Sequence, residues 1–176
     1  MKRLIAVIAL LLCTSAVAQT VGPGPYYATP SWDQQLPSST RFVALSNWGD
    51  GVQAVLDRET GLVWQRRPNS REETWQDASR ICFEAFTGGR AGWKLPTLQD
   101  LMSLFVLGTT DALPAGHPFD GTLALAFWTS TQDKSASSNA YLVRRFPGSV
   151  SVSSTDRASP LGAPWCVRGG SNPDAQ

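Results

Sequence analysis

The sequence predicts an α+β domain with two helices and a mainly antiparallel sheet. Apolar residues recur at helical spacing over residues 74–87 and again over 97–107. Strand patterns lie before and after these helices, and turns that contain Gly or Pro separate neighbouring strands, as at 57–61 and 147–149. Helices grouped in the first half and strands grouped after them indicate α+β organisation rather than a regular βαβ alternation.

The first predicted elements are strands. Residues 41–45 (Arg-Phe-Val-Ala-Leu) form a short apolar run that ends before a polar stretch at 47–51. Residues 52–56 and 62–65 are predicted to form a hairpin because the polar turn between them ends in Gly61.

The first helix is predicted to begin after Thr74. A threonine can cap a helix, and Asp77 three residues later favours the positive end of the helix. Apolar residues, Cys82 among them, share one side of this helix, and Gly88 with Gly89 is expected to end it.

The stretch 92–101 (Gly-Trp-Lys-Leu-Pro-Thr-Leu-Gln-Asp-Leu) predicts a short strand followed at once by the second helix. Its first half alternates apolar and polar residues, and Pro96 ends the extended part. Thr97 can cap the helix, which is expected to run to about Leu107.

The second half of the domain is predicted to consist of strands after a long irregular loop at 109–122. The remaining expected elements are a buried strand at 123–131, a polar loop at 132–139, a hairpin at 140–146 and 150–154, and a last strand at 164–168.

The first 18 residues have the layout of a secretory signal peptide. Lys2 and Arg3 precede an apolar run at 4–12 that is too short to span a bilayer, and a small-x-small pattern at 16–18 precedes Gln19. Lipoprotein processing at Cys13 is the alternative, but the large Leu12 stands where such sites want a small residue. The sequence therefore predicts an exported protein, either periplasmic or extracellular.

The expected mature chain has three parts and holds 176 − 18 = 158 residues. Residues 19–40 are rich in Pro, Gly and Ser and are predicted to form a lead segment. Residues 41–170 form the domain, and 171–176 a polar tail. No second apolar stretch is long enough to act as a transmembrane anchor.

Charge and cysteine content narrow the classes of function. Without Lys2 and Arg3 the chain carries 15 − 2 = 13 basic and 14 acidic residues, a near balance that argues against a nucleic-acid partner. Cys82 and Cys166 remain after removal of the signal peptide, and two cysteines in an oxidising compartment most simply form one disulfide.

Several short motifs together resemble the Lcl C-terminal domain family, named for a bacterial collagen-like adhesin and formerly a domain of unknown function. The motifs, in the family's order, are Arg-Phe-Val at 41–43, Asp57 with Thr-Gly-Leu-Val-Trp-Gln at 60–65, Thr-Trp-Gln-Asp-Ala at 74–78 with Cys82, Gly-Trp-Lys-Leu-Pro-Thr at 92–97, Phe-Trp-Thr-Ser-Thr at 127–131 and Cys-Val-Arg-Gly-Gly at 166–170.

This resemblance implies a C-type-lectin-like fold in which a disulfide ties a helix to the last strand. It also implies adhesion, because the adhesin that names the family binds sulfated glycans. The chain departs from the family pattern in two ways. Residues 19–40 are not a collagen-like repeat, and the hairpin at 144–148 is more basic than usual.

The sequence offers few parts for catalysis or metal binding, so no enzyme, cofactor or metal site is expected. His117 is the only histidine, and it lies between Gly116 and Pro118, where a turn is favoured. Asp111 and Asp120 flank the long loop and could bind calcium. However, Trp-Thr-Ser at 128–130 replaces the Trp-Asn-Asp run usual in sugar-binding C-type lectins.

The candidate ligand-binding residues are arginines and tryptophans. Arginine matches sulfate and carboxylate groups with its fork of donors, which favours Arg66 and Arg67, with Arg71 beside them, and Arg144 and Arg145. Four tryptophans are predicted to lie in the core (Trp64, Trp75, Trp93 and Trp128), and three are expected to be exposed and able to stack on a ligand (Trp32, Trp48 and Trp165).

These observations predict a non-catalytic binding module that recognises anionic or sulfated glycans or a cell-surface protein. The alternative is a structural or protein-interaction component of the bacterial envelope. An enzyme related to the formylglycine-generating oxidases is disfavoured because it would need cysteines that are not paired in a disulfide.

Overall fold

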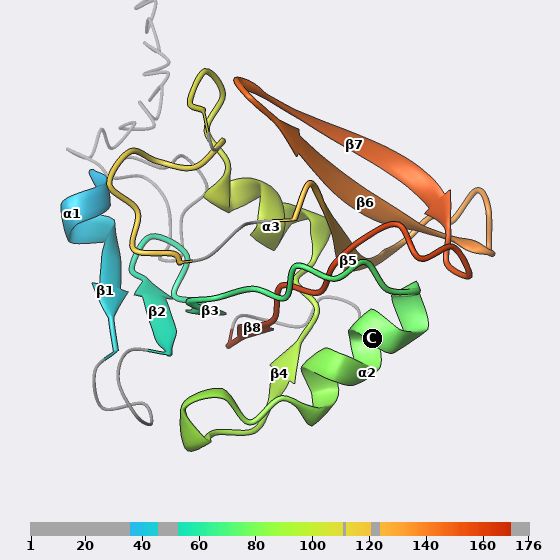
Figure 1. The fold of residues 1–176 in the computed structure, drawn as a ribbon, viewed down its shortest axis with the longest axis horizontal. Helices are drawn as coiled ribbons and strands as arrows, with labels where there is room; N and C mark the ends of the chain where they lie inside the picture. Colours follow the sequence, from blue (N-terminus) through green and yellow to red (C-terminus); the bar gives the residue numbers. More distant parts are fainter. Residues whose placement is uncertain (1–35, 46–52, 111, 121–123, 170–176) are drawn as a thin grey trace, which may run out of the picture.

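The computed structural model describes residues 36–45, 53–110, 112–120 and 124–169. The predicted signal peptide at 1–18, most of the lead segment, the tail, Trp32, Trp48 and Asp111 lie outside these residues. Within the described ranges the fold is α+β, as predicted, with two antiparallel sheets and one disulfide (Figure 1).

The first sheet has five strands in the order β1-β2-β3-β8-β4. Its strands are β1 (Phe42–Ala44), β2 (Ala54–Asp57), β3 (Val63–Gln65), β4 (Trp93–Lys94) and β8 (Val167–Arg168). The predicted hairpin is confirmed: β2 pairs with β3 in antiparallel register, with Val55 opposite Trp64. The last strand, β8, lies between β3 and β4, so the end of the domain is held inside the sheet.

The second sheet has three strands in the order β5-β6-β7. They are β5 (Ala126–Gln132), β6 (Asn139–Phe146) and β7 (Ser149–Asp156), and they include the second predicted hairpin. The segment after β7 returns across this sheet, where Gly162 packs against it. A Cβ at Gly162 would collide with Leu142 Cδ1 and press against the Trp128 ring, so a larger residue would force these side chains to move.

Four helical segments are described, two more than predicted: α1 (Ser38–Arg41), α2 (Trp75–Glu84), the 3-10 turn η1 (Thr87–Gly89) and α3 (Leu98–Leu104). The two helix caps predicted at Thr74 and Thr97 are confirmed. Thr74 accepts a hydrogen bond from Asp77 N, and Thr97 forms a reciprocal capping box with Asp100.

Both predicted helices end earlier than expected. The first ends at Glu84, because Ala85 is already extended, and the glycines at 88 and 89 belong to η1 instead. The second ends at Leu104 rather than Leu107, because the buried Phe105 is extended and turns into the core.

Arg41 is a further correction, because it ends α1 instead of beginning the first strand. Its guanidinium is buried, with Nη2 2.7 Å from Asp57 Oδ2 and Nε 3.4 Å from Glu59 Oε2. Nη2 also donates to the carbonyl of Ser103, at 2.8 Å. One cation thus joins α1, β2 and the end of α3.

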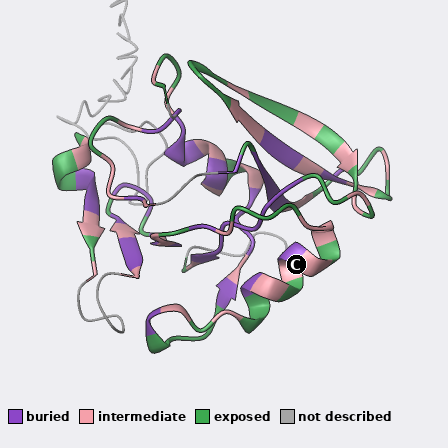
Figure 2. Cartoon of the chain, viewed as in Figure 1, coloured by how far each residue is buried: buried purple, intermediate pink, exposed green. Residues whose placement is uncertain are grey.

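The buried residues form two clusters, which are coloured purple in Figure 2. The first is aromatic and surrounds Trp165, whose ring lies 5.1 Å from Phe119, 5.1 Å from Phe127 and 5.6 Å from Trp64 between centroids. The second surrounds the predicted disulfide between Cys82 and Cys166, which joins α2 to the segment just before β8.

Three of the four tryptophans predicted for the core are buried: Trp64, Trp93 and Trp128. Trp75 is only partly buried, and its Nε1 donates to the carbonyl of Thr129 at 2.8 Å. The expectation that Trp165 is exposed is wrong, because its exposed fraction is 0%.

Candidate functional site

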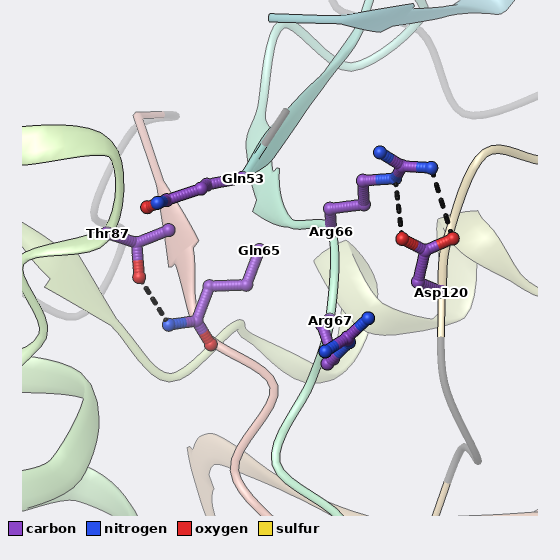
Figure 3. A pocket seen from close by; sticks show the side chains of 6 residues that line it. All are labelled: Gln53, Gln65, Arg66, Arg67, Thr87 and Asp120. Atoms are coloured by element: carbon purple, nitrogen blue, oxygen red, sulfur yellow. Dashed lines mark hydrogen bonds and ion pairs between the residues drawn. The ribbon is translucent and has the colours of Figure 1, made fainter. Parts of the chain in front are cut away.

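A pocket of about 310 Å³ opens where the first sheet meets the loop before β5. The described residues that line it all have polar side chains: Gln53, Gln65, Arg66, Arg67, Thr87 and Asp120 (Figure 3). These side chains come from the start of β2, the end of β3 and the residues after it, η1, and the loop at 112–120. We call this the Gln-Arg pocket.

The two glutamines build one wall of the Gln-Arg pocket. Gln65 Nε2 donates to Thr87 Oγ1 at 2.8 Å, and Gln65 Oε1 accepts from the backbone N of Cys166 at 3.3 Å. Gln53 Oε1 accepts from the backbone N of Gly88 at 2.9 Å. Side-chain amides therefore hold η1 against the sheet, and their orientation is fixed before any ligand arrives.

Arg66 and Asp120 build the opposite wall, where they point toward each other (Figure 3). Arg66 Nε lies 3.1 Å from Asp120 Oδ2, and Nη2 donates to Oδ1 at 3.1 Å. Arg66 Nε also donates to the carbonyl of Pro118 at 3.0 Å, and the backbone N of Asp120 donates to the carbonyl of Arg66 at 2.9 Å. This bidentate pair neutralises Arg66 and fixes the loop to the sheet.

Arg67 is the free cation of the pocket. Its side chain is exposed, and within the described part of the chain it makes no ion pair or hydrogen bond. In the view of Figure 3 it lies between the Gln65 amide and the Arg66–Asp120 pair. The pocket thus offers one uncompensated guanidinium beside amide, hydroxyl and carboxylate groups.

Trp165 is buried beneath the backbone that carries the pocket residues, and its ring is not exposed to a ligand. Its indole Nε1 donates to the carbonyl of Gln65 at 2.9 Å while its ring is packed in the aromatic cluster. The tryptophan therefore sets the position of the backbone that carries Gln65, Arg66 and Arg67.

Of the predicted ligand-binding residues that the structure describes, Arg66 and Arg67 line this pocket, and Arg144, Arg145 and Trp165 do not. Arg144 and Arg145 lie on β6 of the second sheet, and Arg145 Nε donates to the carbonyl of Ala124 at 2.9 Å. The two basic clusters are therefore on separate sheets and do not form one site. Trp48 lies outside the described residues.

Sequence reasoning did not select Gln53, Gln65 or Thr87 for the site. Gln65 stands in a motif that carried the family resemblance, but nothing local marks an amide as a pocket residue. Asp120 was singled out for calcium, whereas the structure pairs it with Arg66.

No metal centre is found within the described ranges: they contain no group of three or more His, Cys, Asp or Glu side chains that could hold an ion. His117 makes a local hydrogen bond within its loop: its Nδ1 accepts from the backbone N of Phe119 at 3.2 Å. None of the helices described is long and apolar enough to cross a membrane.

The structure shows a disulfide-linked α+β domain with a polar pocket beside the first sheet. The profile of the Lcl C-terminal domain matches residues 53–168, about two thirds of the chain, and the chain belongs to that family. This membership indicates an adhesin-like module. No curated protein and no solved structure matches the chain, so the C-type-lectin-like comparison stays a prediction.

Proposed function

We propose that this protein is an exported, non-catalytic binding module that holds an anionic glycan in the Gln-Arg pocket. The glycan class is one that carries sulfate or carboxylate groups. The observation that carries the proposal is Arg67, an exposed guanidinium without an ion pair among the described residues, at a pocket lined by polar groups.

The chemistry of the pocket suits such a ligand. Two parallel N–H donors of a guanidinium match two oxygens of a sulfate or carboxylate group. The amides of Gln53 and Gln65 can each donate and accept, which suits the neighbouring hydroxyl groups of a sugar. Asp120 adds an acceptor whose position is already fixed by Arg66. A preformed wall of this kind lowers the entropic cost of binding.

A catalytic role is not part of the proposal. The described residues that line the pocket include no serine, cysteine or histidine, which are the usual nucleophiles and bases of hydrolases. The two cysteines are joined to each other, which leaves them without a free thiol for redox chemistry. The disulfide and the signal-peptide layout at 1–18 both support export.

The test is a glycan array at low salt with the exported protein, followed by titration of the best ligand. Arg67→Ala should weaken binding roughly tenfold or more, as expected for hydrogen bonds between charged groups. The affinity should also fall as salt is added.

Arg58→Ala is the matched control, because Arg58 is an exposed arginine in the β2–β3 turn and does not line the pocket. It should change the affinity less than about twofold. The proposal fails if the array gives no signal above an unrelated secreted domain, or if both substitutions weaken binding equally. A loss with Arg144→Ala and none with Arg67→Ala would move the site to the second sheet.

A further inference from the structure

Strand β7 is an outer edge of the second sheet. The strand order β5-β6-β7 gives β7 one neighbour, β6, and within the described ranges no other strand pairs with it. Figure 1 shows β7 on the outside of the molecule, with β6 on its inner side.

The hydrogen-bond pattern identifies the backbone groups that point outward from this edge. Phe146 and Ser149 close a two-residue turn, so hydrogen-bonded pairs alternate from there along β6 and β7. Two hydrogen bonds agree with this alternation. Arg145 N donates to Leu125 O, away from β7, and Arg157 N donates to Ser138 O. The N–H and C=O groups of Val150, Val152 and Ser154 therefore face outward.

This edge carries none of the usual protection against pairing. Natural proteins block exposed edges with lysine, proline, bulges or inward charges. Residues 149–155 (Ser-Val-Ser-Val-Ser-Ser-Thr) contain no charge and no proline, and β7 pairs with β6 over eight positions without a shift in register. Val152 is 42% exposed on this strand.

The open part of the edge is short and has defined ends. At one end Gly148 already exchanges hydrogen bonds with the loop before it, with Gly148 N 3.0 Å from Thr109 O and Gly108 N 3.1 Å from Gly148 O. At the other end Ser159 N donates to Asp156 O at 3.1 Å in a turn. The outward backbone groups are thus those of Val150, Val152 and Ser154, spaced evenly about Val152.

We propose that this edge pairs with β7 of a second copy of the chain, antiparallel about a two-fold axis at Val152. In this register Val152 faces Val152 of the other copy, and Val150 faces Ser154. The ladder would hold about six backbone hydrogen bonds and join two three-stranded sheets into one.

Two observations favour a second copy over a foreign peptide. A two-fold contact needs one patch that complements itself, and the outward groups are symmetric about Val152. The strand carries no charge from 149 to 155, so two copies do not repel each other.

The contact leaves the Gln-Arg pocket open, because that pocket is lined by other elements. A dimer would therefore present two pockets, and the dimer does not depend on what the pocket binds.

Sedimentation equilibrium of the exported full chain over a range of concentrations tests the proposal. We expect a reversible monomer–dimer equilibrium. Val152→Lys places two like charges opposite each other at the axis and should weaken the dimer at least tenfold. Ser70→Lys, an exposed change in the loop before α2, should leave the dimer unchanged. Circular dichroism would verify that both variants fold.

Hydrogen exchange of the unmodified protein gives a second test that needs no variant. The amides of Val150, Val152 and Ser154 should exchange slowly in concentrated solution and faster on dilution. A monomer at every concentration, an oligomer that Val152→Lys leaves intact, or exchange at these amides that does not depend on concentration would each overturn the proposal.

Discussion

The disulfide between Cys82 and Cys166 should supply a large share of the stability of the domain. The two cysteines are separated by 84 positions, and the closed loop contains β4, α3 and the whole second sheet. Cys82 lies on α2 and Cys166 just before β8, so the bond joins the helix to an inner strand of the first sheet.

The magnitude follows from the length of the loop. A cross-link removes loop-closure entropy from the unfolded chain, and for a loop of roughly 84 residues the chain-entropy model gives about 4–5 kcal/mol at 25 °C. Domains of this kind are stable by about 5–15 kcal/mol in total. Loss of the disulfide should therefore remove about a quarter of the stability or more.

Urea unfolding followed by tryptophan fluorescence measures this loss. The comparison is between the oxidised protein, the reduced protein and the Cys82→Ala/Cys166→Ala variant. Both changed forms should unfold at lower urea. The variant should lose slightly more free energy of unfolding, because removal of two buried sulfurs also leaves a void. A loss below about 1 kcal/mol in the reduced protein would refute the loop-entropy account.

Two further predictions concern buried and hydrogen-bonded charges. Arg41→Met leaves two buried carboxylates without their cation and should lower the free energy of unfolding by about 3–5 kcal/mol. The control Arg58→Met changes an exposed arginine and should lower it little. Equal losses in chemical unfolding would contradict the stabilising role of the buried ion pair. Hydrogen bonds, mainly from Ser135 and also from Ser154, hold the pKa of Asp133 below its usual 3.8. The ionised carboxylate therefore stabilises the fold above that pH, and this contribution to stability is lost as the pH falls. The difference in stability between wild type and Asp133→Asn should thus be larger at about pH 7 than at about pH 3, and a difference independent of pH would contradict it.

The sequence determined much of the local structure because local structure depends on neighbouring residues. Thr74 and Thr97 marked both helix starts correctly, since a cap needs only a hydroxyl and a nearby backbone N–H. Both hairpins followed from alternating strands about a Gly-containing turn. The family followed from short motifs in a fixed order, and its profile confirms it.

The ends of the helices were less predictable. The second helix stops at Leu104 because Phe105 turns into the aromatic cluster, and that cluster is assembled from distant parts of the chain. Arg41 was expected in an ordinary strand, and only its partners Asp57 and Glu59 explain its burial.

Trp165 shows what the tertiary structure alone decides. Its ring was expected to be exposed, but the next strand, β8, inserts between β3 and β4 and carries the tryptophan into the core. The Gln-Arg pocket depends on the same long-range pairing, because Gln65 receives a hydrogen bond from Cys166 and another from Trp165. The sequence determined which elements form and which family the chain belongs to. Only the packing of distant parts of the chain decided that Asp120 pairs with Arg66 and leaves Arg67 without an ion pair among the described residues.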